Sequence, residues 1–165
     1  MKLKPAALTA QALLAVAASL ALSCASPCPK DAFVDDQAGY CLVLPGGYKK
    51  ASHNEKEGQE VYGFGPTGRM IMFLRRATEP EYTRIVNQIN ERRATPPDSV
   101  QIVEIGRTET AAWQIVQYKG QTTFETEYAF TDEKRQRFGR CTATYAKERE
   151  ARDVLAACRT ARLTR

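Results

Sequence analysis

The hydrophobic and polar positions of the chain form one long apolar run at the start and a series of short, separated runs after it. The first run extends from Ala6 to Leu22 and follows Lys2 and Lys4. A basic start, an apolar centre and small residues at the end are typical of a secretory signal peptide. The run is shorter than the roughly 20 apolar residues that span a bilayer, and no basic cluster follows it, so we expect cleavage.

Three strands are predicted before the first helix, at residues 40–44, 60–64 and 69–76. The polar residues 49–60 are expected to form a loop or a frayed edge. Residues 65–68, Gly-Pro-Thr-Gly, are typical of a hairpin turn between the second and third strands. Residues 70–74 are apolar without alternation, which predicts a central strand covered on both faces.

The first helix is predicted to begin after Thr78, which can cap it while Glu81 completes a capping box. An apolar stripe follows at helical spacing and consists of Tyr82, Ile85, Val86 and Ile89. The helix is expected to end near Arg93, because Pro96 and Pro97 prevent its continuation.

Four further strands are predicted at residues 100–105, 112–118, 122–130 and 137–145, with a second helix at residues 147–162. Short connections between these strands indicate antiparallel pairing. The order βββ-α-ββββ-α predicts an α+β domain in which two helices pack on an antiparallel sheet of about six or seven strands.

The five cysteines of the chain are Cys24, Cys28, Cys41, Cys141 and Cys158. Four cysteines can pair in three ways, and we favour the pairs that are close in sequence, Cys28–Cys41 and Cys141–Cys158. Each bond would close a short loop and contribute about 3 kcal/mol. No Cys-x-x-Cys spacing occurs and the spacings do not suit zinc, so structural disulfides are predicted rather than redox or metal chemistry.

Lipid attachment at Cys24 would explain the odd number of cysteines. Residues 20–24, Leu-Ala-Leu-Ser-Cys, resemble the lipobox of bacterial lipoproteins, although Ala21 and Leu22 stand in the reverse of the preferred order. Ordinary cleavage after Ser23 or Ala25, which would give a soluble periplasmic or secreted protein, is the alternative. By the same resemblance, Ala25 favours sorting to the outer membrane. We therefore predict a signal peptide at 1–23, a lipid-anchored tether at 24–38 and a folded domain at 39–165.

The charge of the chain does not indicate a nucleic-acid partner. The net charge is +5, or +3 without Lys2 and Lys4, and basic residues are interspersed with acidic ones. The export signal also argues against a nucleic-acid partner. A solvated surface of mixed charge is expected, with weak attraction to anionic lipid or cell-wall polymers as the alternative.

Residues 39–48, Gly-Tyr-Cys-Leu-Val-Leu-Pro-Gly-Gly-Tyr, are similar to the opening strand of the PsbP-like family, which includes the DcrB-type bacterial lipoproteins. The first helix after a long apolar strand and the closing helix through 154–159 resemble the same family. The chain departs from it in Cys41, Cys141 and Cys158, and in Tyr48, where tryptophan is commoner. The resemblance implies a non-catalytic accessory subunit of a membrane-associated complex, with no shared catalytic residues.

Two motifs with possible chemistry are expected to be structural. Residues 63–68 match the pattern G-x-G-x-x-G, but a strand follows where a dinucleotide site needs a helix, so a hairpin turn is predicted. His53 is the single histidine and lies in a polar segment; it cannot build a zinc site alone, and no nucleophile elbow accompanies it, so we expect an exposed bystander.

Glu125 and Glu127 share a strand face and could act as paired carboxylates of a glycosidase. Cross-strand ion pairing with basic residues of adjoining segments, such as Lys119 and Arg137, is favoured instead. Six aromatic residues could line a pocket but are expected to be core: Trp113, Tyr118, Phe124, Tyr128, Phe130 and Tyr145.

These features predict an exported, lipid-anchored binding or assembly component of a cell-envelope complex, with a protein partner and a membrane contact through its lipid. No catalytic residue, metal or cofactor is predicted. The alternative is a periplasmic or surface module that binds a small ligand or a cell-wall glycan.

Overall fold

The computed structural model describes residues 28–35, 39–56, 59–65, 72–132 and 134–164. Their elements are β1 (Ala32–Asp35), β2 (Tyr40–Val43), β3 (Lys49–Lys56), β4 (Gln59–Gly65), β5 (Met72–Ala77), α1 (Glu79–Ala94), β6 (Val100–Arg107), β7 (Ala111–Tyr118), β8 (Phe124–Thr131), β9 (Phe138–Tyr145), α2 (Glu148–Cys158) and β10 (Arg162–Leu163). The main sheet has the strand order β3-β4-β5-β9-β8-β7-β6, and a small sheet has the order β1-β2-β10.

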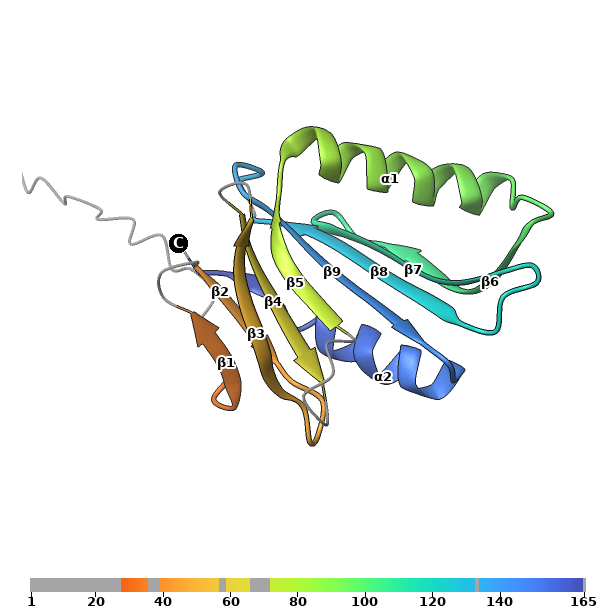
Figure 1. The fold of residues 1–165 in the computed structure, drawn as a ribbon. Coiled ribbons are helices and arrows are strands. Elements are labelled where there is room, and N and C mark those ends of the chain that lie inside the picture. The colour runs from red at the N-terminus through yellow and green to blue at the C-terminus, as the bar shows by residue number, and fades with distance from the viewer. Residues whose placement is uncertain (1–27, 36–38, 57–58, 66–71, 133, 165) are drawn as a thin grey trace, which may run out of the picture.

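The predicted fold class is confirmed: the domain is α+β, with two helices packed on an antiparallel sheet of seven strands. α1 lies over one face of the main sheet and α2 lies against the other (Figure 1). The strand predicted at the centre, β5, is indeed interior, between β4 and β9. Its Met72 and Leu74 are fully buried on the α2 side, and Phe73 is half-buried.

Three segments differ from the prediction. Residues 49–56, predicted as a loop or frayed edge, form the edge strand β3, which pairs with β4 through its backbone although its sequence is polar apart from Ala51. Residues 32–35, predicted as tether, form β1, so the ordered domain begins before Gly39. The predicted helix at 147–162 ends at Cys158, and β10 then pairs with β2 and buries Leu163.

The residues of α1 that face the sheet are those of the predicted stripe. Thr78 caps the helix, because its Oγ1 accepts the backbone N–H of Glu81 at 3.4 Å. Ile85 and Ile89 are fully buried against Ala112 and Ala129, whose small side chains let the helix approach the sheet. Tyr82 and Val86 pack beside them.

The larger core lies on the α2 side of the sheet. Ala151, Val154, Leu155 and Cys158 of α2 are buried against strand residues that include Leu74, Ile115 and Cys141. Leu42 of the small sheet joins the same core. α2 therefore packs between the main sheet and the small sheet.

Both cysteine pairs favoured from the sequence form disulfides in the structure. Cys141–Cys158 joins β9 to the last residue of α2, with the two Cα atoms 5.8 Å apart. Cys28–Cys41 joins the beginning of the described chain to β2, with the Cα atoms 5.9 Å apart. One bond thus fixes the closing helix and the other fixes the entry of the chain into the domain.

We expect Gly139→Ala to lower the free energy of unfolding by about 1–3 kcal/mol, because overpacking a core forces buried groups to shift. Gly139 lies directly opposite Phe130, and a Cβ atom there would lie 2.3 Å from Cζ of the buried Phe130 ring. Denaturant unfolding of the purified domain measures the change. Gly46→Ala is the control, since a Cβ at Gly46 would meet nothing within 4 Å; equal stabilities for the two variants would contradict the prediction.

Candidate functional site

Between α1 and the main sheet lies a group of polar side chains that we call the α1–sheet polar cluster. It comprises Arg75 from β5, Glu81 and Arg92 from α1, Gln114 from β7, Glu127 from β8 and Arg140 from β9. Five elements contribute to it, so it forms only when the helix docks on the sheet. It is the most extensive polar contact that the structure describes between α1 and the strands.

Arg140 bridges Glu81 and Glu127, and Arg75 binds Glu81 as well. The guanidinium of Arg75 donates to both carboxylate oxygens of Glu81, with 3.0 Å between Nη1 and Oε2. Arg140 lies between the two glutamates: its Nη1 is 3.2 Å from Oε1 of Glu81 and its Nη2 is 2.8 Å from Oε1 of Glu127. These ion pairs fasten the first turn of α1 to the middle of the sheet.

The chain of hydrogen bonds continues toward the end of α1. Gln114 donates to Glu127 at 2.9 Å and accepts from Arg92 at 2.9 Å. Arg92 also donates to the hydroxyl of Tyr118 at 3.1 Å and is 8% exposed. Because Arg92 lies in the last turn of α1, the negative end of the helix dipole also favours its charge.

The charges of the cluster act on the pKa of Glu81. Burial of the carboxyl group raises its pKa, but the hydrogen bond and charge of Arg75, with those of Arg140, outweigh burial and hold it below its usual value. A carboxyl group whose pKa is depressed on folding stabilises the protein above its unfolded pKa. That contribution is lost as the pH falls through the folded pKa.

We expect Glu81→Gln to lower the free energy of unfolding at pH 7 by about 1–2 kcal/mol, because hydrogen bonds to a charged group are lost. The wild type should lose this contribution as the pH falls below about 5, whereas the variant should not. Urea unfolding from pH 7 to pH 3 measures both effects.

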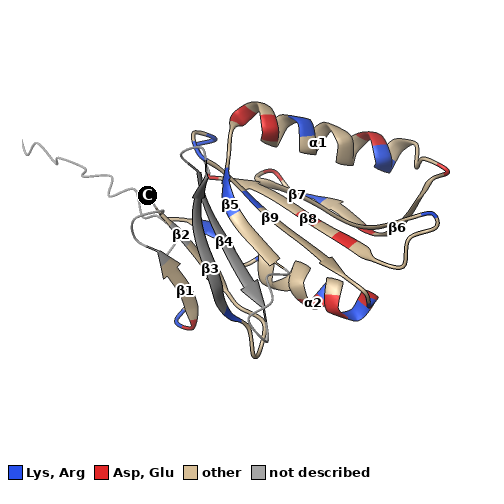
Figure 2. Ribbon diagram, viewed as in Figure 1, with Lys and Arg blue, Asp and Glu red and all other residues tan. Residues whose placement is uncertain are grey.

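Glu79→Gln is the matched control, because both residues lie in the acidic first turn of α1 (Figure 2) and share the interaction with the helix dipole. Glu79 is exposed, whereas Glu81 is half-buried between two arginines. If the two variants lost the same stability with the same pH profile, the ion pairs of Glu81 would contribute nothing of their own.

The glycosidase hypothesis for Glu125 and Glu127 gains no support from this geometry. Both lie in β8, two positions apart, and so point to the same face. Glu127 is held by Arg140 and Gln114 and belongs to the polar cluster. The ion pairing favoured from the sequence is therefore present for Glu127, although its partner is Arg140.

Arg137, one of the two expected partners, pairs with a different carboxylate. Its Nε is 3.0 Å from Oδ2 of Asp132 in the turn between β8 and β9. Burial raises the pKa of Asp132, but the bonds from Arg137 and from the backbone N–H of Gln136 lower it more, so it stays below its usual value. This contact fastens the turn rather than the sheet face.

Most of the aromatic residues proposed as a pocket are core, as expected. Tyr128, Phe130 and Tyr145 are buried, and Trp113 and Phe124 pack against the same cluster. The guanidinium of Arg159 covers the Trp113 ring at 4.3 Å from its centroid. Tyr118 differs from the rest, because its hydroxyl belongs to the polar contact with Arg92.

The remaining candidates add no chemistry. His53 lies in the edge strand β3 rather than in a loop. Gly63 and Gly65 of the G-x-G-x-x-G pattern lie in β4, and residues 66–68 fall outside the described residues. No group of three or more His, Cys, Asp or Glu that could hold a metal occurs among the residues described, nor does the described part of the chain include a helix long and apolar enough to cross a membrane.

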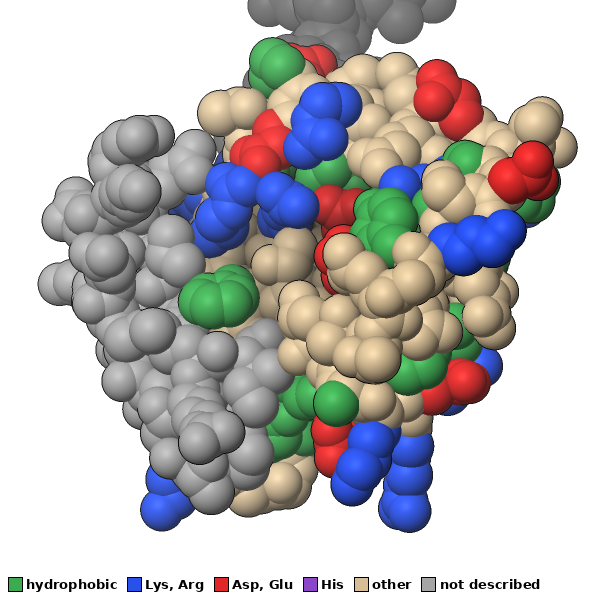
Figure 3. All heavy atoms as spheres, turned by 45° about the vertical axis from the view of Figure 1, so that its right-hand side comes forward, with side chains coloured by type: hydrophobic (Ala, Val, Ile, Leu, Met, Phe, Trp, Pro, Cys, Tyr) green, Lys and Arg blue, Asp and Glu red, His purple; other side chains and the backbone are tan. Residues whose placement is uncertain are grey.

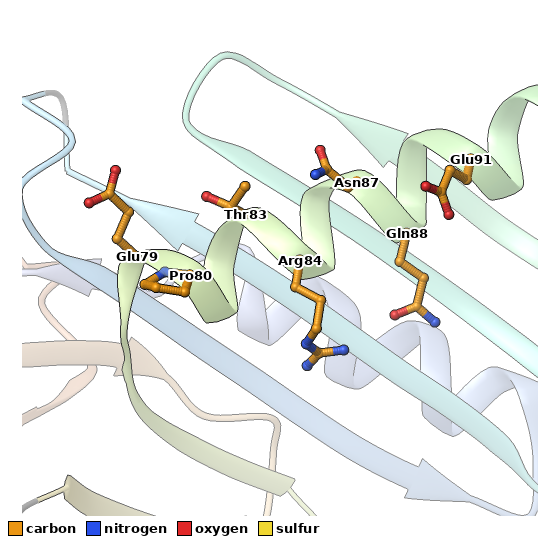
Figure 4. Close-up of a pocket in the computed structure, with 7 residues that line it drawn as sticks. All are labelled: Glu79, Pro80, Thr83, Arg84, Asn87, Gln88 and Glu91. Atoms are coloured by element: carbon orange, nitrogen blue, oxygen red, sulfur yellow. The ribbon is translucent and has the colours of Figure 1, made fainter.

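A shallow polar groove runs along the outer side of α1. It is lined by Glu79, Pro80, Thr83, Arg84, Asn87, Gln88 and Glu91 (Figure 4). The spacing of these residues places them on the flank of the helix that turns away from Ile85 and Ile89. Basic, acidic and apolar side chains are interspersed on the face shown in Figure 3. Such a surface suits contact with a polar macromolecule better than enclosure of a small apolar ligand.

The architecture defines a class: an α+β domain with one helix on each face of an antiparallel sheet, closed by a second small sheet. Among solved structures, the Ran-binding protein Mog1p of Saccharomyces cerevisiae is similar, with a TM-score of 0.50 and 10% sequence identity over 84% of this chain and 97% of that one. At this identity the likeness shows the fold alone. No protein-family model and no curated protein matches the sequence.

Proposed function

We propose that this protein is an exported, lipid-anchored, non-catalytic component of a cell-envelope complex that works by binding another protein. The observation that carries the proposal is the state of the cysteines. The two disulfides use four of the five, which leaves Cys24 as the remaining cysteine, directly after the predicted signal peptide. Disulfides of this kind suit the oxidising compartment to which such a signal leads.

The polar cluster supports binding rather than catalysis. Its carboxylates are engaged by arginines and an amide, and the depressed pKa of Glu81 is unsuited to a general acid at neutral pH. The cluster holds α1 in place and thereby presents the polar groove on its outer side. The likeness to Mog1p, which is described as Ran-binding, is compatible with this use of the fold.

The second candidate is a module that binds a small ligand or a cell-wall glycan. The observation that favours it is the groove itself. Its lining includes Thr83, Asn87 and Gln88, whose hydroxyl and amide groups can form hydrogen bonds with the hydroxyl groups of a sugar. Its shallowness favours the first candidate, since small-molecule sites enclose most of their ligand.

Crosslinking in intact cells, followed by purification of the lipidated protein, tests the proposal. A stoichiometric protein partner is expected, and it should remain with Glu125→Gln and His53→Gln variants, because neither residue acts as a catalyst in this account. Recovery of the protein alone under all crosslinking conditions would refute the assembly role. A thermal shift on adding wall fragments, without any protein partner, would favour the ligand-binding module instead.

A further inference from the structure

The small sheet has an outer face that turns away from the core. Phe33, Leu42 and Leu163 of its three strands pack inward. Because neighbouring positions of a strand point to opposite sides, the other face carries Val34, Cys41 and Arg162. The register places these three residues in one row across β1, β2 and β10. We call this row and its surroundings the outer face of the small sheet.

The chain enters the domain at this outer face. Cys28 is bonded to Cys41, which lies in the middle of the row and has no exposed surface. Cys24 stands four positions before Cys28. Four residues span at most about 14 Å when fully extended, so the disulfide limits how far the outer face can be from Cys24.

This reach is short compared with the dimensions of a membrane surface. An acylated cysteine lies near the boundary of the hydrocarbon core, and the headgroup layer beyond it is about 5–8 Å thick. Cys28 can therefore lie no more than about 6–9 Å above the headgroups. A domain attached so closely cannot tumble freely above the bilayer.

We propose that the outer face of the small sheet lies against the lipid bilayer that holds the acyl chains of Cys24. The proposal rests on the lipid anchor of the proposed function and adds the orientation of the domain. The occupant of this face is the headgroup layer of the bilayer itself. α1 lies on the opposite face of the main sheet from the small sheet (Figure 1), so α1 and the groove on its outer side then face the compartment in which a protein partner would be met.

The surface chemistry of this end is compatible with such a contact. Val34 is 45% exposed, and among the residues that the structure describes it is the one large hydrophobic residue that is exposed. Lys30 and Asp31 are exposed in the turn before β1, and Arg162 is exposed on β10. The guanidinium of Arg162 donates to the backbone carbonyls of Arg159 and Ala161, so it is held at the surface. The exposed charges here are two basic residues and one acidic residue, which gives at most a weak attraction to anionic lipid, so the short tether is the main cause of the contact.

Acetylation of native lysines tests the orientation. The full-length lipidated protein is reconstituted in vesicles of phosphatidylethanolamine and phosphatidylglycerol, treated with an amine-reactive reagent and digested for mass spectrometry. The comparison protein carries about twelve glycine and serine residues inserted between Ser26 and Pro27, which lengthens the tether without altering the described domain. Lys30 reports on the outer face. Lys119 and Lys147 are the control positions, because they lie at the end of the sheet where α2 begins. β10, which is part of the small sheet, follows the other end of α2.

Lys30 should react several-fold more slowly in the native protein than in the variant with the longer tether, whereas Lys119 and Lys147 should react equally in both. If Lys30 reacted equally in both proteins while both floated with the vesicles, the orientation would be wrong and the anchor would stand. If the native protein did not float with the vesicles at all, the anchor and the orientation would both fall.

Discussion

Replacing Cys141 and Cys158 together with alanine is expected to lower the free energy of unfolding by about 3 kcal/mol, the value for a disulfide that closes a loop of this length. The bond spans 17 positions and joins β9 to the end of α2. Both cysteines are fully buried in the larger core, so the loss of sulfur contacts adds to the loss of the cross-link. For a domain of this size the melting temperature should fall by about 10 °C.

Calorimetry of the oxidised wild type, the reduced wild type and the C141A/C158A variant separates the contribution of the cross-link from that of the sulfur contacts in the core. The reduced wild type loses the cross-links but keeps the sulfur atoms in the core. C28A/C41A supplies the second reference, because that disulfide closes a loop of similar length, 13 positions, outside the α2 contact. A C141A/C158A variant as stable as the oxidised wild type would show that packing alone holds α2.

Cys24→Ser is expected to move the protein from the membrane fraction to the soluble fraction almost completely. Several acyl chains bury many methylene groups, each worth about 0.8 kcal/mol, and the described residues offer no other span for a bilayer. Fractionation of cells that express the full chain, with detection in the membrane and soluble fractions, measures the change.

Cys28→Ser with Cys41→Ser is the control for this experiment. It removes two cysteines close to Cys24 and leaves the predicted lipidation site intact, so the protein should stay in the membrane fraction. If Cys24→Ser were processed to its mature mass and still remained with the membranes, the lipid at Cys24 would not be what holds the protein there.

The sequence predicts the interior strands and both helices because burial leaves a hydrophobic pattern in each of these elements. The apolar run that includes Met72 and Leu74 of β5 and the helical stripe through Ile85 and Ile89 reflect that burial directly. The strand β3 pairs on one side only and carries a polar sequence, so its pattern resembles that of a loop. The strand β1 has four residues, too few for a period to show.

The polar cluster could not be predicted as a unit, because its residues come from five elements that are distant in sequence. One signal was nevertheless present. Arg92 follows Ile85 and Ile89 at the spacing of the buried stripe, which places a charged side chain against the sheet. A buried arginine needs acceptors, and Gln114 and Tyr118 supply them here.

The central claim is that Cys24 is an acylated N-terminus and that the four other cysteines are paired. Mass spectrometry of the intact mature protein, with and without thiol alkylation, tests both parts together. We predict a chain that begins at Cys24, carries the added mass of its acyl chains and takes up no alkylating reagent before reduction. An unmodified chain that begins at Cys24 or Ser26, or one with a free thiol, would contradict this account.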